Sequence, residues 1–484
     1  MKKFFVTNLI FLLTLNILIK SFWILGIDRG VQNALPASDY GIYYALLNFT
    51  YLFNIILDLG ITQFNNRTIA QNSVLLKKYF AKIVPLKLIL AFVYAFILFV
   101  AATFTGYDGF SFFLLRWLCV FQILTSILTY LRSNVSALLL FKTDSFLSVL
   151  DKSLTVIFCS VLLWTPLLKN GMKIEYFVYV QVLSMGISCL TALIICLTKT
   201  GLIKPVWDVK FMIKILKFGF PYALLTLLMS FYNRMDTVMI ERILTDGKVQ
   251  SGIYASGFRL VDSVNMIAYL FSVILLPLFA KMIKEKLDVG AIIKISFQLL
   301  LLAGVSFVAV SVVYANELMI LLYNKHIEES TQVYRVLSFC FIPISMTYIF
   351  GTLLTANGSL KKLNVVALCG MIINIVINLI LIPHYKALGS AYSALTAQTV
   401  TALLQAIIAM KIFNIRFSLK YCLKIILFII LIGLSAVLIS KTDLLWYYKV
   451  VISLIVFVLI SFICRIFSVV EVKNYAFEII KSKK

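Results

Sequence analysis

Apolar runs of about 20 residues, each long enough to cross a lipid bilayer, recur along the whole 484-residue chain. Short segments with turn-forming and charged residues separate them. The chain is 62% hydrophobic and only 13% charged, whereas soluble proteins are typically about 25% charged. Such a composition excludes an ordinary soluble domain, and we predict an all-α polytopic membrane protein.

The apolar runs, divided by the turn-forming and charged segments between them, predict about fourteen transmembrane helices. The predicted spans are 4–27, 41–64, 79–103, 112–135, 146–168, 174–198, 216–240, 252–278, 291–314, 333–356, 363–383, 388–412, 421–440 and 446–468. The first has a basic start like a signal peptide. Its apolar stretch exceeds the roughly 7–15 residues of a signal sequence, so we interpret it as a retained span.

The net charge of +24 raises the question of a nucleic-acid partner, but its distribution favours a membrane topology. With a cytoplasmic N-terminus, about thirty of the 44 Lys and Arg residues fall at the inner surface, Lys87 and Lys152 among them, and about eleven at the outer surface. We therefore place both termini in the cytoplasm and expect no nucleic-acid partner. The cysteines lie almost all in apolar runs and the two histidines lie far apart, so we expect no metal site and no cofactor.

A short phrase occurs twice. "YGIYYALLNF" contains Gly41, and "SGIYASGFRL" contains Gly252, 211 positions later. Before each copy, an apolar helix ends near an acidic residue, and a turn-rich loop then leads to the phrase. The acid is Asp28 before the first copy and Asp236 before the second. We interpret this as a duplicated helical bundle whose copies are related by an axis along the membrane normal, an arrangement found in several transporters.

Between the two copies, residues 199–215 differ from their surroundings. From Lys204 to Lys217, four lysines alternate with apolar residues such as Trp207. The pattern predicts an amphipathic helix on the inner leaflet, although a plain connector with inner positive charges fits the same residues. We expect four parts: an N-terminal lobe at 1–198, the connector, a C-terminal lobe at 216–413, and two further spans with a cytoplasmic tail at 414–484.

The stretches "SDYGIYYALLNFTYLFNIILDLGITQFNNRTIA", "NRMDTVMIERILTDGKVQSGIYASGFRLVDSV" and "ALGSAYSALTAQ" resemble signature regions of the polysaccharide transporters. These are the O-antigen flippase-like members of the multidrug/oligosaccharidyl-lipid/polysaccharide exporter superfamily. The resemblance implies two six-helix lobes around a central cavity plus two C-terminal helices. It also implies transfer of undecaprenyl-diphosphate-linked saccharides, for O-antigen, capsule or exopolysaccharide, from the inner to the outer leaflet of the bacterial cytoplasmic membrane.

Three cations stand inside predicted spans, where an ionisable group costs at least about 2.5–3.5 kcal/mol and usually faces a cavity or a partner. They are Lys20, Arg234 and Arg259. We predict that they bind the diphosphate, because guanidinium groups offer bidentate hydrogen bonds to phosphate oxygens. Ser256 lies on the same helical stripe as Arg259, and Asn48 is its counterpart in the first copy.

Three acids are candidates for pairing or for coupling: Asp262, Asp236 and Asp58. The alternative to the binding hypothesis is structural. Arg259 could pair with Asp262, Asp58 could cap a helix or pair with a cytoplasmic cation, and Lys20 could extend to the interface.

Two other functions compete with the flippase hypothesis. A cation-coupled exporter of small drugs needs acids deep in the N-terminal lobe, and Asp58, Asp144 and Asp151 are not clearly central. A membrane enzyme needs paired acids or a metal site, which the short outer loops do not supply. We expect a monomeric transporter, not an enzyme, that works beside glycosyltransferases and a polysaccharide polymerase. The sequence leaves open the saccharide and the energy source.

Overall fold

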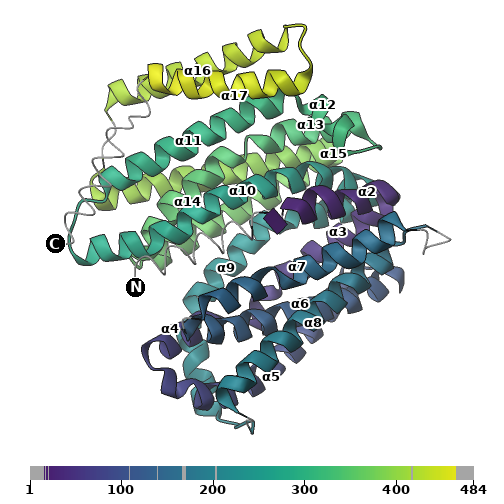
Figure 1. The fold of residues 1–484 in the computed structure, drawn as a ribbon, viewed down its shortest axis with the longest axis vertical. Coiled ribbons are helices and arrows are strands. Elements are labelled where there is room, and N and C mark those ends of the chain that lie inside the picture. Colours follow the sequence, from purple (N-terminus) through teal and green to yellow (C-terminus); the bar gives the residue numbers. More distant parts are fainter. Residues whose placement is uncertain are drawn as a thin grey trace. The chain divides into compact units, whose positions relative to one another are not determined.

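The structure is a computed structural model that describes residues 16, 18–19, 21–107, 109–138, 140–165, 171–201, 204–415 and 418–464. Within these residues the chain is built from helices and contains no strand. The first half contains the elements η1 (Trp23–Asp28), α2 (Arg29–Ala34), α3 (Ala37–Leu52), η2 (Asn54–Leu57), α4 (Ile61–Gln71), η3 (Ser73–Leu75), α5 (Leu76–Phe104), α6 (Gly109–Ala137), α7 (Phe141–Trp164) and α8 (Ile174–Thr200) (Figure 1). The second half contains α9 (Val209–Ile243), α10 (Gly247–Lys284), α11 (Gly290–Val313), α12 (Ala315–Leu322), α13 (Ile327–Ser338), α14 (Phe341–Ala356), α15 (Leu360–Phe413), α16 (Leu419–Ser440) and α17 (Trp446–Ile463).

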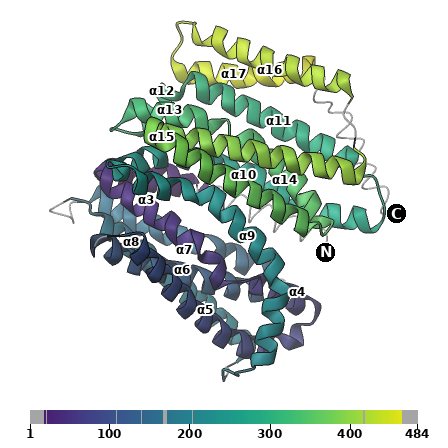
Figure 2. The same cartoon turned by 180° about the vertical axis from the view of Figure 1, so that it is seen from behind.

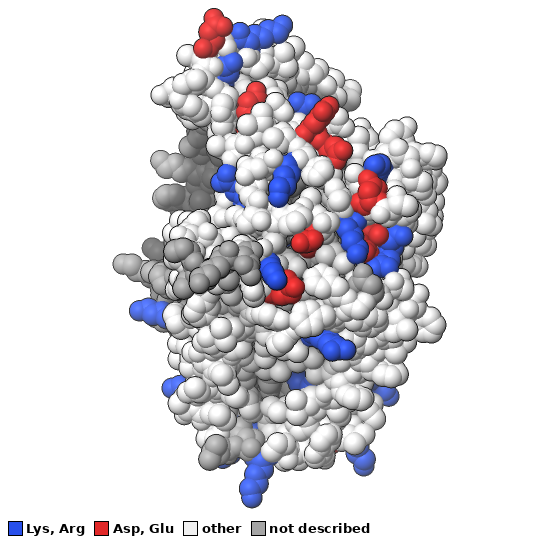
Figure 3. Space-filling view, turned by 90° about the vertical axis from the view of Figure 1, so that its right-hand side faces the viewer, with Lys and Arg blue, Asp and Glu red and all other residues white. Residues whose placement is uncertain are grey.

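These helices confirm the predicted all-α, multi-pass membrane protein. In the described part of the chain, ten helices are long and apolar enough to cross a membrane. One of them, α15, contains two predicted spans, because its backbone turns at Lys386, where φ is 53° and ψ is −132°. Large apolar side chains such as Phe92, Phe104 and Leu438 are exposed, and the face drawn in Figure 3 is mostly uncharged. An apolar exterior of this kind suits lipid.

The described residues form two compact units. The first comprises those up to Ser256 together with Tyr323–Lys325 and Asn374–Ser390, and the second comprises Gly257–Leu322, His326–Ile373 and those from Ala391 onward. In the second unit, α16 and α17 lie side by side (Figures 1 and 2). Phe428 and Phe457 are fully buried there, in a cluster that includes Leu301 and Val305 of α11. The two C-terminal helices therefore have a packed inner side and a lipid-facing outer side.

The two copies of the repeated phrase contact each other inside the first unit. A Cβ atom on Gly41 of α3 would overlap the carbonyl oxygen of Lys248, and one on Gly252 of α10 would overlap the carbonyl oxygen of Ala37. Both pairs are related by the same shift of 211 positions, so the contact is reciprocal, like an isologous interface. Only glycine lets the two helix starts approach this closely.

The predicted second span is broken. Helix α3 ends at Leu52, one short 3-10 turn follows, and α4 starts at Ile61. The backbone has positive φ at Leu59 (44°) and Gly60 (81°). Gly219 of α9 packs directly on this turn, and a Cβ there would overlap the carbonyl oxygen of Leu59. The break therefore places irregular backbone within a predicted span, which requires polar partners for the freed groups.

Of the predicted connector 199–215, residues 199–200 end α8 and residues 209–215 belong to α9. Residues 204–208 are not helical, and α9 begins at Val209. Pro205 disfavours helix at the residue before it, and Asp208 caps α9 by accepting a hydrogen bond from the Phe211 amide at 3.0 Å. The Lys82 ammonium donates to the same carboxylate at 2.6 Å, which lowers the pKa of Asp208. The connector is thereby fixed to α5.

Candidate functional site

The candidate binding residues lie on three helices, α3, α9 and α10. Helix α3 carries Asn48, and it runs beside α9 (Figure 2). Helix α9 carries Arg234 and Asp236, and α10 carries Ser256, Arg259 and Asp262. Lys20 lies outside the described residues.

Arg234 and Asn48, which were predicted separately, meet in the structure. The Arg234 guanidinium donates to Asn48 Oδ1 at 3.4 Å and lies over the Tyr51 ring, 5.1 Å from its centroid. Asn48 in turn donates to Thr237 Oγ1 at 2.8 Å. Tyr51 was not predicted, although it stands one helical turn after Asn48 on the same face. Together, Asn48 and Tyr51 fix the position of a half-buried cation.

Arg259 and Ser256 lie one turn apart on α10, and both are buried. Arg259 is 7% exposed, which is unusual for an arginine. The Ser256 hydroxyl donates to the Ile253 carbonyl at 2.7 Å, and the Ser256 carbonyl accepts from Tyr323 at 3.2 Å. These two contacts give Ser256 a structural role as well. Asp262, three residues after Arg259, is half-buried.

Asp236 is the most deeply buried of the predicted acids, with 2% of its surface exposed. Its carboxylate accepts hydrogen bonds from Tyr254 at 2.9 Å, from Asn374 at 3.0 Å and from Asn378 at 2.8 Å. These three partners are uncharged, and two come from α15. Arg234 lies two residues before Asp236 on α9, and residues two apart on a helix point to different sides.

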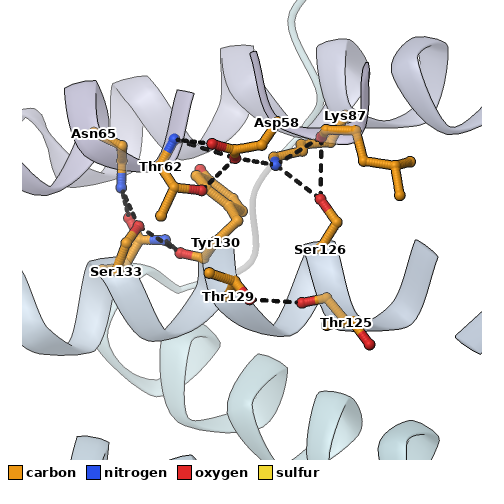
Figure 4. A network of polar contacts seen from close by, with 11 residues as sticks. Asp58, Thr62, Asn65, Lys87, Thr125, Ser126, Thr129, Tyr130 and Ser133 are labelled. Carbon is orange, nitrogen blue, oxygen red and sulfur yellow. Dashed lines mark hydrogen bonds and ion pairs between the residues drawn. The ribbon is translucent and has the colours of Figure 1, made fainter. Parts of the chain in front are cut away.

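Asp58 pairs with a cation that sequence reasoning had placed at the inner surface. The Lys87 ammonium donates to Asp58 Oδ1 at 2.6 Å, to the Leu57 carbonyl at 2.9 Å and to Ser126 Oγ at 3.1 Å (Figure 4). Asp58 also accepts from the amide and the hydroxyl of Thr62 at the start of α4. The pair thus satisfies the carbonyl and amide groups that the break between η2 and α4 leaves free.

The pairing of Asp58 with a cation was one of the predicted alternatives, but the depth of its partner Lys87 and of Lys152 was missed. Lys87 is only 5% exposed and lies about 17 Å from the start of α5 at 1.5 Å per residue. Lys152 lies near the middle of α7, beside Asp151. Assigning these residues to the inner surface, and denying Asp151 a central place, was therefore wrong. The sequence could have indicated these positions, because Lys87 falls within the predicted span 79–103, and Asp151 and Lys152 fall within the predicted span 146–168.

Comparisons with solved structures show the same fold in transporters of the MOP superfamily. An inward-facing MATE multidrug transporter matches with a TM-score of 0.63 and 14% identity, over 81% of this chain and 94% of that one. The lipid II flippase MurJ in an inward closed conformation matches with a TM-score of 0.61 and 14% identity, over 92% of this chain and 97% of that one. A MOP superfamily transporter from Pyrococcus furiosus matches with a TM-score of 0.52 and 15% identity, over 84% and 95% of the two chains.

None of the curated proteins matches this sequence. A family model described as polysaccharide biosynthesis protein matches residues 5–283. This match covers more than half of the 484 residues and contains both copies of the repeated phrase. The chain belongs to the polysaccharide biosynthesis protein family.

Proposed function

We propose that this protein is a flippase for undecaprenyl-diphosphate-linked oligosaccharide, the repeat unit of an O-antigen, capsule or exopolysaccharide. It moves this lipid from the inner to the outer leaflet of a bacterial cytoplasmic membrane by alternating access. The observation that carries the proposal is a set of basic side chains held inside apolar helices: Arg234 on α9 and Arg259 on α10. The family, and the shared fold with a lipid II flippase and multidrug transporters, support it.

The chemistry of the cargo explains the cations. A diphosphate cannot enter hydrocarbon without a counter-charge, and an arginine within a span costs at least about 2.5–3.5 kcal/mol. When the arginine binds the diphosphate, their attraction offsets both the cost of placing the arginine in the span and the cost of bringing the diphosphate into the membrane. The planar guanidinium of Arg234, held by Asn48 and Tyr51, suits phosphate oxygens. We include Lys20 in this set from its place in the sequence.

A large anionic cargo also explains the two-lobe plan. In this proposal, residues 1–198 and 216–413 are lobes that rock about a central cavity, with 199–215 as the connector and 414–484 as an addition. Both termini are cytoplasmic, and the protein acts as a monomer. Glycosyltransferases supply the lipid-linked saccharide, and a polymerase consumes it at the outer leaflet.

Energy coupling belongs to Asp236 rather than to Asp58. Asp58 is neutralised by the Lys87 ammonium at 2.6 Å, so a second cation would have to displace a lysine. Asp236 has the three uncharged partners named above, and the amide and phenol oxygens beside it suit a proton or a small monovalent cation. A buried carboxylate of this kind favours binding of a positive charge, because its own charge is costly there.

The function is tested in a strain that lacks the protein. We expect lipid-linked saccharide to accumulate in the inner leaflet and surface polysaccharide to disappear, with both restored by the wild-type chain. Arg259→Ala should restore less than about a tenth of the surface polysaccharide at equal protein level. Normal surface polysaccharide in the deletion strain would contradict the flippase assignment. Full restoration by Arg259→Ala would remove that residue from the site.

A further inference from the structure

An ion pair lies near mid-membrane depth on α7. Lys152 is about 17 Å from the start of the helix and about 18 Å from its end, at 1.5 Å per residue. Its ammonium lies 3.4 Å from the Asp151 carboxylate. The side chains are 20% and 12% exposed, respectively. Two consecutive residues normally diverge on a helix, so both side chains bend toward a common point.

Aromatic rings support the same ammonium. Lys152 Nζ lies 4.5 Å from the centroid of Trp23 in η1 and 5.9 Å from that of Phe121 in α6. A cation over an aromatic face gains about 0.5–2 kcal/mol. Trp23 opens a π-helical turn, a local geometry that frequently occurs at functional sites. The three elements thus meet around one lysine, which we call the Lys152 cluster: Trp23, Phe121, Asp151 and Lys152.

Stability alone does not explain the ion pair between Asp151 and Lys152. Asp151 and Lys152 are adjacent, so their pair joins no two helices, and at 3.4 Å it is longer than a close charge-assisted hydrogen bond. The tighter pair Arg132–Asp144, at 2.8 Å, joins α6 to α7. Ionisable groups at this depth are functional by default. A long ion pair such as this one is expected if the Lys152 ammonium exchanges the Asp151 carboxylate for another anion.

We propose that Lys152 is an anion-binding residue for a phosphate group, and that Asp151 occupies it in the empty protein. This proposal rests on the proposed function and adds a site to it. When a phosphate approaches, its oxygens replace the Asp151 carboxylate at the ammonium, while the rings of Trp23 and Phe121 remain beside that ammonium. The released Asp151 is then a like charge beside the phosphate, which limits the affinity and favours release.

Binding of farnesyl diphosphate to the full chain in phosphatidylcholine nanodiscs tests this. We expect Lys152→Gln to raise the Kd at least about tenfold, and Asp151→Asn to lower it about threefold or more. Lys152→Arg keeps the charge and should bind within about threefold of the wild type. Ligand should also change the emission of Trp23, a signal that Trp23→Phe removes. Thermal melting confirms that each variant is folded.

The outcomes separate this proposal from the proposed function. If the wild type does not bind farnesyl diphosphate, the prenyl-diphosphate cargo itself is wrong. If it binds, and Arg259→Ala weakens binding while Lys152→Gln and Asp151→Asn leave the Kd unchanged, only the Lys152 cluster is refuted. Inorganic diphosphate and farnesol distinguish recognition of the phosphates from that of the chain. Competition by phosphatidylglycerol at equal strength would make the Lys152 cluster a headgroup site and overturn the proposal.

Discussion

The two copies of the repeated phrase share their backbone contact and differ in their polar side chains. In the first copy, Asp28 accepts hydrogen bonds from Tyr40 at 2.9 and 3.0 Å and from Gln32 at 3.2 Å, all within twelve residues. In the second copy, Asp236 is held partly by Asn374 and Asn378, which are 138 and 142 positions away. The first acid thus accepts these hydrogen bonds from residues close to it in sequence, whereas the second also uses a distant helix.

The position seven residues after each glycine differs as well. It is Asn48 in the first copy and Arg259 in the second. Asn48 uses its amide to bind Thr237 and Arg234 of α9. The close contact of the two helix starts therefore requires the glycines but does not require a cation at this position. The comparison separates residues that maintain the architecture from those that give it a function.

The largest loss of stability is expected at the two glycines, which both copies share. Gly41→Leu or Gly252→Leu places side-chain atoms onto the backbone of the other copy, and we expect the free energy of unfolding to fall by about 3 kcal/mol or more. Folded yield and thermal melting in detergent measure this. Gly433→Leu on the exposed side of α16 is the matched control, because a Cβ there meets nothing within 4 Å. A normal melting curve for both glycine variants would show that the reciprocal contact is not required.

The two acids should respond differently to loss of charge. We expect Asp236→Asn to reduce transport at least about tenfold, because it removes the proposed coupling charge while keeping a similar shape. Asp28→Asn should leave transport within about threefold, since Tyr40 and Gln32 can still bind the amide oxygen. Surface polysaccharide in the complemented deletion strain measures both, with protein level as the control. Equal losses in the two variants would mean that the acids play the same structural part.

A third test places an arginine in the first copy at the position where the second copy has Arg259. Asn48→Arg would place a guanidinium beside Arg234, which now lies 3.4 Å from Asn48 Oδ1. We expect a destabilisation of about 1–3 kcal/mol from charge repulsion and the lost amide bonds. Asn48→Ser, which removes the amide without adding charge, is the control. A melting temperature that is equal for the two variants would show that repulsion contributes nothing.

The smallest effect concerns the turn before the second copy. Lys386 donates to Asp246 at 2.7 Å and lowers the pKa of that carboxyl below its ordinary value of 3.8. The pair therefore stabilises the fold above about pH 4 and loses this contribution as the pH falls through the lowered pKa. Because both side chains are exposed, we expect at most about 0.5 kcal/mol. Melting of the wild type and of Asp246→Asn should differ at pH 7 and converge once the pH is below the lowered pKa of Asp246, and a constant difference would contradict the assignment.

Much of the fold could be predicted from the sequence because its cause is local. A run of about 20 apolar residues must span the bilayer as a helix, so the described parts of the predicted spans from 79–103 onward are almost entirely helical, with 333–356 divided between α13 and α14. The repeat also pointed correctly to Gly41 and Gly252 as counterparts, and to Asp28 and Asp236 as the acids before them. What hydropathy missed is the break at Leu59 and Gly60, because the overall apolar character of 41–64 hides one turn of irregular backbone.

The sequence by itself determined that the chain is an all-α membrane protein and that Gly41 and Gly252 are counterparts, since hydropathy and repetition are properties of the residues alone. The tertiary structure alone decided which ionisable side chains are paired. Lys87 meets Asp58, Lys152 lies between Trp23 and Phe121, and Asp236 is surrounded by amides of α15. Their electrostatic environment depends on helices far apart in the chain, and no local pattern specifies which of these helices pack together.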